Sequence, residues 1–170
     1  HLEMQVLASR ERYTDFASRD HSVHSVEAYG RFVSEGFCAE VYSASDQLRG
    51  MSKEHRFGTI AEINNVLAYA QRYAYELDSV GKGVLEYPKY PLETMVDDRG
   101  DCEDHAILAA ACLLQLGYDV RLVDMPGHMA LAVAAPGDVP GGWFLRDEGT
   151  GKKFYFCEVT TGGSSGGPNR

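Results

Sequence analysis

The sequence has little of what marks nucleic-acid-binding, membrane-spanning or disulfide-rich proteins. Acidic residues outnumber basic ones by 25 to 16, and the formal net charge of -9 leaves no basic face for binding phosphates. No apolar run approaches the roughly 18 residues that a membrane helix needs, and no signal peptide is visible. We therefore expect no nucleic-acid partner and no membrane insertion. The compartment stays open between the cytoplasm and the soluble part of a larger or membrane-anchored protein.

Cysteine is also scarce. The four cysteines are too few and too irregularly spaced for a disulfide scaffold or a paired C-x-x-C zinc site, so reduced thiols are expected. Cys38, Cys112 and Cys157 lie among apolar residues, as small buried hydrophobic side chains do. Cys102 differs because polar and charged residues surround it.

The composition indicates one globular domain. In a chain of 170 residues, 44% hydrophobic and 24% charged residues are enough for a substantial core. Up to about residue 80 the chain reads as helical, and its clearest helix starts at Thr59. There, Thr59 as N-cap and Glu62 would form a capping box. The apolar positions that follow keep the helical period and predict one buried face: Ile63, Val66, Leu67, Ala70, Ala74 and Leu77.

The second half changes from helices to strands. The pattern predicts a helix from about Cys102 to Gln115, with Gly117 as its stop signal. Strand candidates follow at residues 118–124, 128–134, 143–146 and 153–161, and a Pro-Gly turn joins the first two. The tail, residues 162–170, is rich in glycine and serine and is expected to be flexible.

The most informative motif is Gly-Asp-Cys-Glu-Asp-His at residues 100–105, where the Ala-rich helix begins. Asp101 is a good N-cap, which puts Cys102 at the first helical position. The helix N-terminus favours a thiolate, whereas the carboxylates of Asp101, Glu103 and Asp104 would raise the thiol pKa if they point inward. An imidazolium partner would decide between these opposing effects in favour of the thiolate.

His128 is the candidate for that partner. It opens an apolar strand and shares one face of it with three small residues, Ala130, Ala132 and Ala134. We expect the Ala-rich helix to pack on this face and to bring the imidazole beside Cys102. Glu158 interrupts another apolar strand, and a hydrogen bond to the other ring nitrogen of His128 would satisfy its carboxylate. Thiol, imidazole and carboxylate then suggest a nucleophile, its base and the group that orients the base.

Two other classes remain open. A metal-dependent hydrolase would draw on the side chains of Asp101, Asp104, His105, His128 and Glu158. However, adjacent helical residues such as Asp104 and His105 point about 100° apart and do not face one ion comfortably. The domain could also be a non-catalytic binding module.

Taken together, residues 100–104, 116–120, 126–130 and 158–160 resemble the transglutaminase-like superfamily, especially its archaeal and bacterial members. The resemblance spans residues 87–161. It implies a papain-like α+β fold, in which N-terminal helices and a helix carrying the catalytic cysteine pack on an antiparallel β-sheet. By position it implies Cys102 as nucleophile, His128 as base and Glu158 as orienting acid, where superfamily members more often have aspartate.

The resemblance implies cysteine-dependent acyl transfer through a thioester, with either hydrolysis or transamidation as the outcome. The expected substrate is a protein or peptide amide, with an amine as a possible acceptor and no cofactor or metal. Residues 81–161 would form the catalytic core, and residues 1–80 a helical region packed on it. We expect the Cys102 backbone N–H to stabilise the oxyanion, with Gln71 or Tyr90 as candidates for a second donor. The oligomeric state is not predicted.

Overall fold

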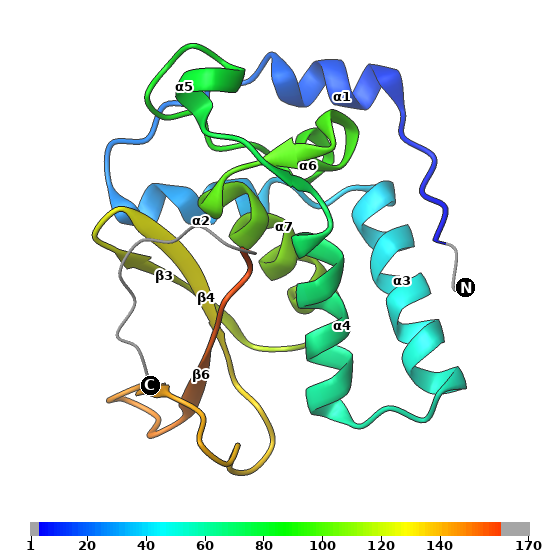
Figure 1. Cartoon of the computed structure of the whole chain (residues 1–170), viewed down its shortest axis with the longest axis vertical. Helices are drawn as coiled ribbons and strands as arrows, with labels where there is room; N and C mark the ends of the chain where they lie inside the picture. Colours follow the sequence, from blue (N-terminus) through cyan, green and yellow to red (C-terminus); the bar gives the residue numbers. More distant parts are fainter. Residues whose placement is uncertain (1–3, 161–170) are drawn as a thin grey trace.

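The computed structural model describes residues 4–160 and has an α+β fold (Figure 1). Its helices are α1 (Arg10–Ala17), α2 (Tyr29–Ser34), α3 (Ala39–Glu54), α4 (Thr59–Gln71), α5 (Asp78–Gly81), α6 (Pro91–Asp97) and α7 (Cys102–Gln115), with a 3-10 turn η1 (Val26–Ala28) before α2. Its strands are β1 (Ala74–Tyr75), β2 (Arg99–Gly100), β3 (Val120–Met125), β4 (His128–Val133), β5 (Phe144–Arg146) and β6 (Lys153–Cys157).

Helix α7 is the centre of the fold. It contacts α2, α3, α4 and α6 as well as β3 and β4, so it lies between the helical layer and the sheet (Figure 1). Every residue from Ala106 to Leu113 is at most 2% exposed, as expected for a helix that is apolar all round. The predicted bounds are confirmed, and Gly117, at a φ of +88°, ends the helix in the left-handed region that glycine adopts freely.

The sheet is antiparallel with the strand order β3-β4-β6-β5. Met125 pairs with His128 across a two-residue turn, where proline fixes φ at residue 126 and Gly127 takes a φ of +72°. The predicted strands are present with slightly different bounds. One difference matters: β6 ends at Cys157, so Glu158 follows the strand instead of lying within it.

The face of β4 that packs on the helical layer is not the one predicted. The core cluster that contains α7 takes Met129, Leu131 and Val133 from β4, whereas Ala130 and Ala132 lie outside it. The larger side chains bury more apolar area against α7, and this outweighs the closer approach that alanines would permit. His128, the first residue of β4, therefore lies on the same face of the strand as the alanines. Its position relative to Cys102 is set by the start of β4 and not by the face that packs on α7.

The predicted helix at Thr59 is confirmed, but its cap and its end are wrong. Gly58 occupies the N-cap position in an extended conformation, and Thr59 is the first helical residue. The first four predicted apolar positions are buried, from Ile63 to Ala70, and the helix ends at Gln71. The chain then forms β1, which pairs in parallel with β2 so that Tyr75 lies opposite Gly100. This pairing, absent from the prediction, brings residues 74–75 to the start of α7.

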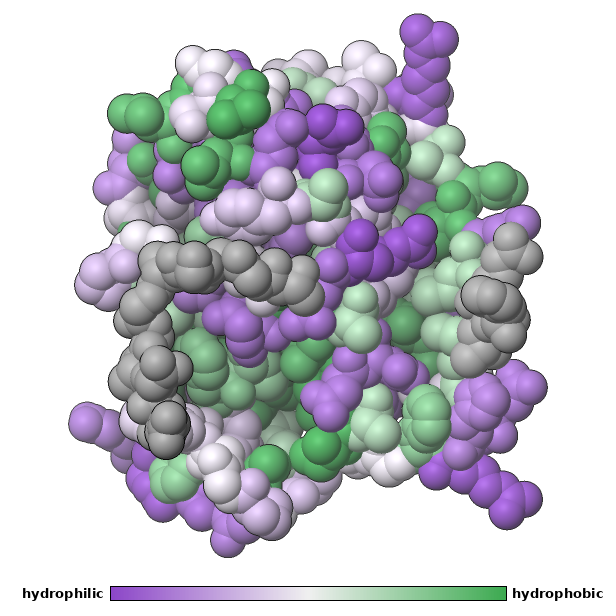
Figure 2. Space-filling view, in the orientation of Figure 1, coloured by the Kyte–Doolittle hydropathy of each residue, from purple (hydrophilic) through white to green (hydrophobic). Residues whose placement is uncertain are grey.

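The helical region and the sheet share one hydrophobic core. Buried residues from α1 to α4, such as Phe32 and Val66, belong to the same cluster as those of α7 and β4. Among residues 4–160, no helix has the length and apolar character to cross a membrane. The predicted tail at 162–170 lies outside the described residues. Figure 2 shows an apolar patch over α5, where the exposed residues include Leu77, Val80, Val84 and Leu85.

Candidate active site

The start of α7 places Cys102 at the edge of the core. Asp101 adopts the extended N-cap conformation as predicted, and its backbone N–H donates to Oδ2 of Asp104 over 3.4 Å. Gly100 allows this close turn, because a β-carbon there would lie 2.5 Å from that of Asp104. Cys102 is the first helical residue and is half-buried. Its sulfur is thus held by the helix start and not by a flexible loop.

The thiol of Cys102 donates a hydrogen bond to Oε2 of Glu103 over 3.2 Å. The backbone of Met129 and the side chain of Tyr75 lie near enough to the sulfur to interact with it, but within residues 4–160 the hydrogen bond of the thiol is the one to Glu103. Burial, followed by the negative charge of Glu103, raises the pKa of the Cys102 thiol to about 12. Burial and the Glu103 carboxylate therefore outweigh the helix N-terminus, and the Cys102 thiol is neutral.

His128 and Glu158 are joined directly. Nε2 of His128 lies 2.8 Å from Oε2 of Glu158, while Oε1 accepts hydrogen bonds from the backbone N–H groups of Val159 and Thr160, both at 2.9 Å. The Glu158 side chain is 44% exposed, so it is not the buried strand carboxylate that the sequence suggested. Burial alone would raise the pKa of Glu158, but the hydrogen bonds from Thr160 and His128 hold it below its ordinary value.

The two halves of the site meet at the end of β4. The backbone of Met129, the residue that follows His128, lies near the sulfur of Cys102 and lowers its pKa. Since Nε2 of His128 is bonded to Glu158, Nδ1 is the ring nitrogen left for a second partner. In the part of the chain that the structure describes, the hydrogen bond of the thiol goes to Glu103 and not to His128.

A family model matches most of the chain. The model of a transglutaminase-like domain matches residues 40–149, about two thirds of the chain, including Cys102 and His128. The chain belongs to the transglutaminase-like domain family. The match begins within α3 and ends before Glu158. Comparison with curated proteins and with solved structures gave no significant match.

The two residues considered as second oxyanion donors in this transglutaminase-like domain lie in different surroundings. Nε2 of Gln71, at the end of α4, donates to the backbone oxygen of Glu158 over 3.1 Å, so Gln71 borders the site. Tyr90 is 2% exposed, and its ring packs with those of Phe16 and Phe32, each with its centroid 4.9 Å away. Tyr90 is therefore a core residue.

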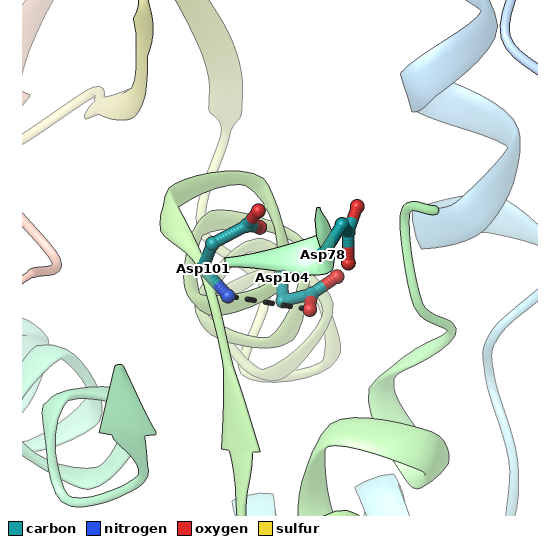
Figure 3. Close-up of side chains that lie close together, drawn as sticks. All are labelled: Asp78, Asp101 and Asp104. Atoms are coloured by element: carbon teal, nitrogen blue, oxygen red, sulfur yellow. Dashed lines mark hydrogen bonds between the residues drawn. The ribbon is translucent and has the colours of Figure 1, made fainter. Parts of the chain in front are cut away.

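A cluster of buried carboxyl groups supports the helix start. Asp78, Asp101 and Asp104 offer oxygens within 4.8 Å of one another, and Figure 3 shows Asp104 between the other two. The buried ammonium group of Lys89 lies 3.3 Å from Oδ2 of Asp104 and donates to the backbone oxygen of Arg99 over 2.9 Å. Burial is the main cause that raises the pKa of all three aspartates, and that of Asp101 reaches about 9.

The metal-site alternative drew on aspartates and histidines together, and the structure separates them. Within residues 4–160, Asp101 and Asp104 join Asp78, but no histidine belongs to their group. His105 packs edge-on to Tyr75 with centroids 6.3 Å apart, and burial lowers its pKa, so its ring is neutral. The cluster already holds the Lys89 ammonium group. It is therefore described better as an internal charge cluster than as a metal centre.

Three residues of the site region were missed by the sequence analysis. Tyr75 lies at the start of α7 because β1 pairs with β2, and Asp78 and Lys89 come from the segments between β1 and α6. No periodicity or short motif carries these long-range contacts. Glu103 was recognised as an acidic neighbour, but its burial, at 6% exposure, was not anticipated.

Proposed function

We propose that the protein is an enzyme that transfers acyl groups from peptide or protein amides to its own cysteine, with Cys102, His128 and Glu158 as nucleophile, base and orienting acid. The observation that carries the proposal is the 2.8 Å bond between Nε2 of His128 and Oε2 of Glu158 at the start of β4, where the backbone of the next residue, Met129, lies near the Cys102 sulfur. A thiol at a buried helix start, an imidazole and a carboxylate, in this order, suit the formation of a thioester.

The proposed reaction proceeds in two steps. The proton of the Cys102 thiol passes to Nδ1 of His128, and the sulfur attacks the carbonyl carbon of the amide. The imidazolium then gives the proton to the departing ammonia or amine, which leaves a thioester. Water or a primary amine attacks the thioester and releases an acid or a new amide. Glu158 fixes the ring through Nε2 and favours the imidazolium form.

Two groups are candidates to stabilise the oxyanion. The backbone N–H of Cys102 lies in the first turn of α7, where amides have no partner four residues earlier. We assign the second donor to Tyr75, because its side chain lies near the sulfur and is 46% exposed. Gln71 is the alternative donor, but its amide is engaged with the backbone of Glu158.

Ammonia release tests this proposal. Glutamine-containing peptides are incubated with the protein, with and without a primary amine, and ammonia and peptide products are quantified. We expect release by the wild type, loss in Cys102→Ser, and a decrease of at least about 100-fold in His128→Ala. Cys157→Ser is the control, because Cys157 is also half-buried but lies at the end of β6. Equal release by wild type and Cys102→Ser would contradict the proposal.

A non-catalytic binding module is the second candidate function. The neutral thiol of Cys102, bonded to Glu103, favours it because a resting nucleophile is usually more acidic. In this case Cys102→Ser would retain ligand binding, and no peptide amide would be consumed. The same ammonia assay therefore separates the two functions.

A further inference from the structure

Glu103 occupies an unusual position for a glutamate on a helix. It follows the nucleophile directly, yet its side chain is 6% exposed and does not extend into solvent. Its carboxylate accepts the Cys102 thiol hydrogen through Oε2, and the carboxyl group of Asp101 lies close enough to affect its pKa. The carboxylate of Glu103 therefore accepts the thiol hydrogen at the helix start.

This arrangement sets Glu103 in competition with His128. A thiol has one hydrogen, and it cannot be donated to Oε2 of Glu103 and to Nδ1 of His128 at once. We propose that Glu103 is a positioning residue, which holds the Cys102 thiol protonated and turned away from His128 until that hydrogen bond is broken. The inference rests on the proposed function, because it takes His128 as the base.

The surroundings of the pair support this role. Burial raises the pKa of Glu103 to about 7, and the interaction with the Asp101 carboxyl group opposes this shift, so Glu103 is charged above about pH 7. Burial and this carboxylate together raise the thiol pKa. The other titratable groups near Cys102, Glu103 or Asp101 come from several elements: Asp104 on α7, Tyr29 on α2, Tyr75 on β1, Asp78 on α5 and Glu86 before α6. The Lys89 ammonium group lies against Asp104.

Release of the thiol completes the proton path. When the hydrogen bond to Glu103 is broken, the thiol proton is transferred to His128. The S–H bond breaks, an N–H bond forms at Nδ1, and the electron pair stays on sulfur. Glu103 keeps its charge and takes no proton. A bound substrate that displaces the thiol from Oε2 would thus switch on the nucleophile.

The test measures the alkylation of Cys102 by iodoacetamide from about pH 7 to about pH 10, resolved by peptide mass spectrometry. Glu103→Gln keeps the shape and removes the charge, and its amide can donate to a thiolate. We expect the Cys102 rate at about pH 8, where Glu103 is ionised, to rise at least about tenfold, the effect of one unit in thiol pKa. Glu103→Asp restores the charge and should return the rate toward that of the wild type. Glu148→Gln, in an exposed loop, is the control.

Two further measurements keep the inference falsifiable. Cys38 and Cys112 are buried and report general opening, so a rise shared equally by all three cysteines counts against a positioning role. His128→Ala, labelled without substrate, should leave the Cys102 rate unchanged, because the resting thiol is bonded to Glu103. A slower rate in His128→Ala would overturn the inference.

The inference and the proposed function can fail separately. An unchanged pH profile in Glu103→Gln, together with ammonia release that requires Cys102, would overturn the inference and leave the function. Faster labelling of Cys102 in Glu103→Gln without any amide turnover by the wild type would support the hold on the thiol and contradict the enzyme.

Discussion

Replacing Asp101 with asparagine should stabilise the protein at alkaline pH. In the folded protein the pKa of Asp101 is raised to about 9, mainly by burial and then by Glu103, whereas an unfolded aspartate titrates near about 4. The folded state therefore keeps a proton that the unfolded chain releases. Stability from this group is complete at acidic pH and is lost as pH rises from about 4 toward about 9.

The size of the effect follows from the one retained proton. Each pH unit in this interval lowers the free energy of unfolding by about 1.4 kcal/mol, so a change from about pH 6 to about pH 8 costs about 3 kcal/mol. For a chain of this length, this is a decrease of about 6–12 °C in Tm. The asparagine in Asp101→Asn would be neutral at every pH, would cap the helix as well as aspartate does and can donate to Glu103. The variant should therefore lose the part of the pH dependence of its free energy of unfolding that comes from Asp101.

Thermal unfolding followed by circular dichroism from about pH 5 to about pH 8.5 provides the assay. The wild type and Asp101→Asn should diverge as pH rises, with the variant more stable at the alkaline end. Asp46→Asn is the matched control, because Asp46 lies exposed on α3. Parallel curves for wild type and Asp101→Asn, or a wild type that becomes more stable at higher pH, would refute the role of burial at the helix start.

Two further predictions concern the shape and the charge of the site. Gly100→Ala should lower the free energy of unfolding by about 1–3 kcal/mol and reduce ammonia release, because its β-carbon would overlap the Asp104 side chain; Gly30→Ala, with open space around it, should do neither, and equal Tm losses in both would contradict this. Glu158→Gln should reduce kcat/KM about 10-fold to 100-fold, because a neutral amide does not offset the positive charge that the His128 ring gains during the reaction; an unchanged kcat/KM would argue against the pairing.

The fold was predictable where local patterns decide it. The bounds of α7 follow from the Asp101 cap, the apolar run and Gly117, and the hairpin between β3 and β4 follows from its Pro-Gly turn. These features depend on neighbours within a few residues. The resemblance to transglutaminase-like proteins supplied the α+β architecture, which the family match over residues 40–149 bears out.

The site was predictable only in part, because its electrostatics depend on burial. The sequence paired His128 with Glu158 correctly, although it placed Glu158 within a strand that ends one residue earlier. It also assigned the wrong face of β4 to the helix, because it weighed the room left by small residues above the area buried by larger ones. The position of Glu103 in the sequence did not indicate that its side chain points into the protein.

The long-range contacts at the helix start could not be predicted. The parallel pairing of Tyr75 with Gly100 joins two strands of two residues each, which are too short for any alternation to be visible. Lys89 is buried against Asp104 from a connector that reads as an ordinary proline-containing loop. Such contacts depend on tertiary packing, which fixes the chain only after the core has formed.

Intact-mass spectrometry of the protein after exposure to a glutamine-containing peptide tests the central claim most directly. The account predicts a covalent adduct on the wild type, with the mass of the peptide minus ammonia, that disappears on addition of a primary amine and is absent from Cys102→Ala. An adduct of equal yield on Cys102→Ala, or none on a wild type that consumes the peptide, would contradict a thioester on this cysteine.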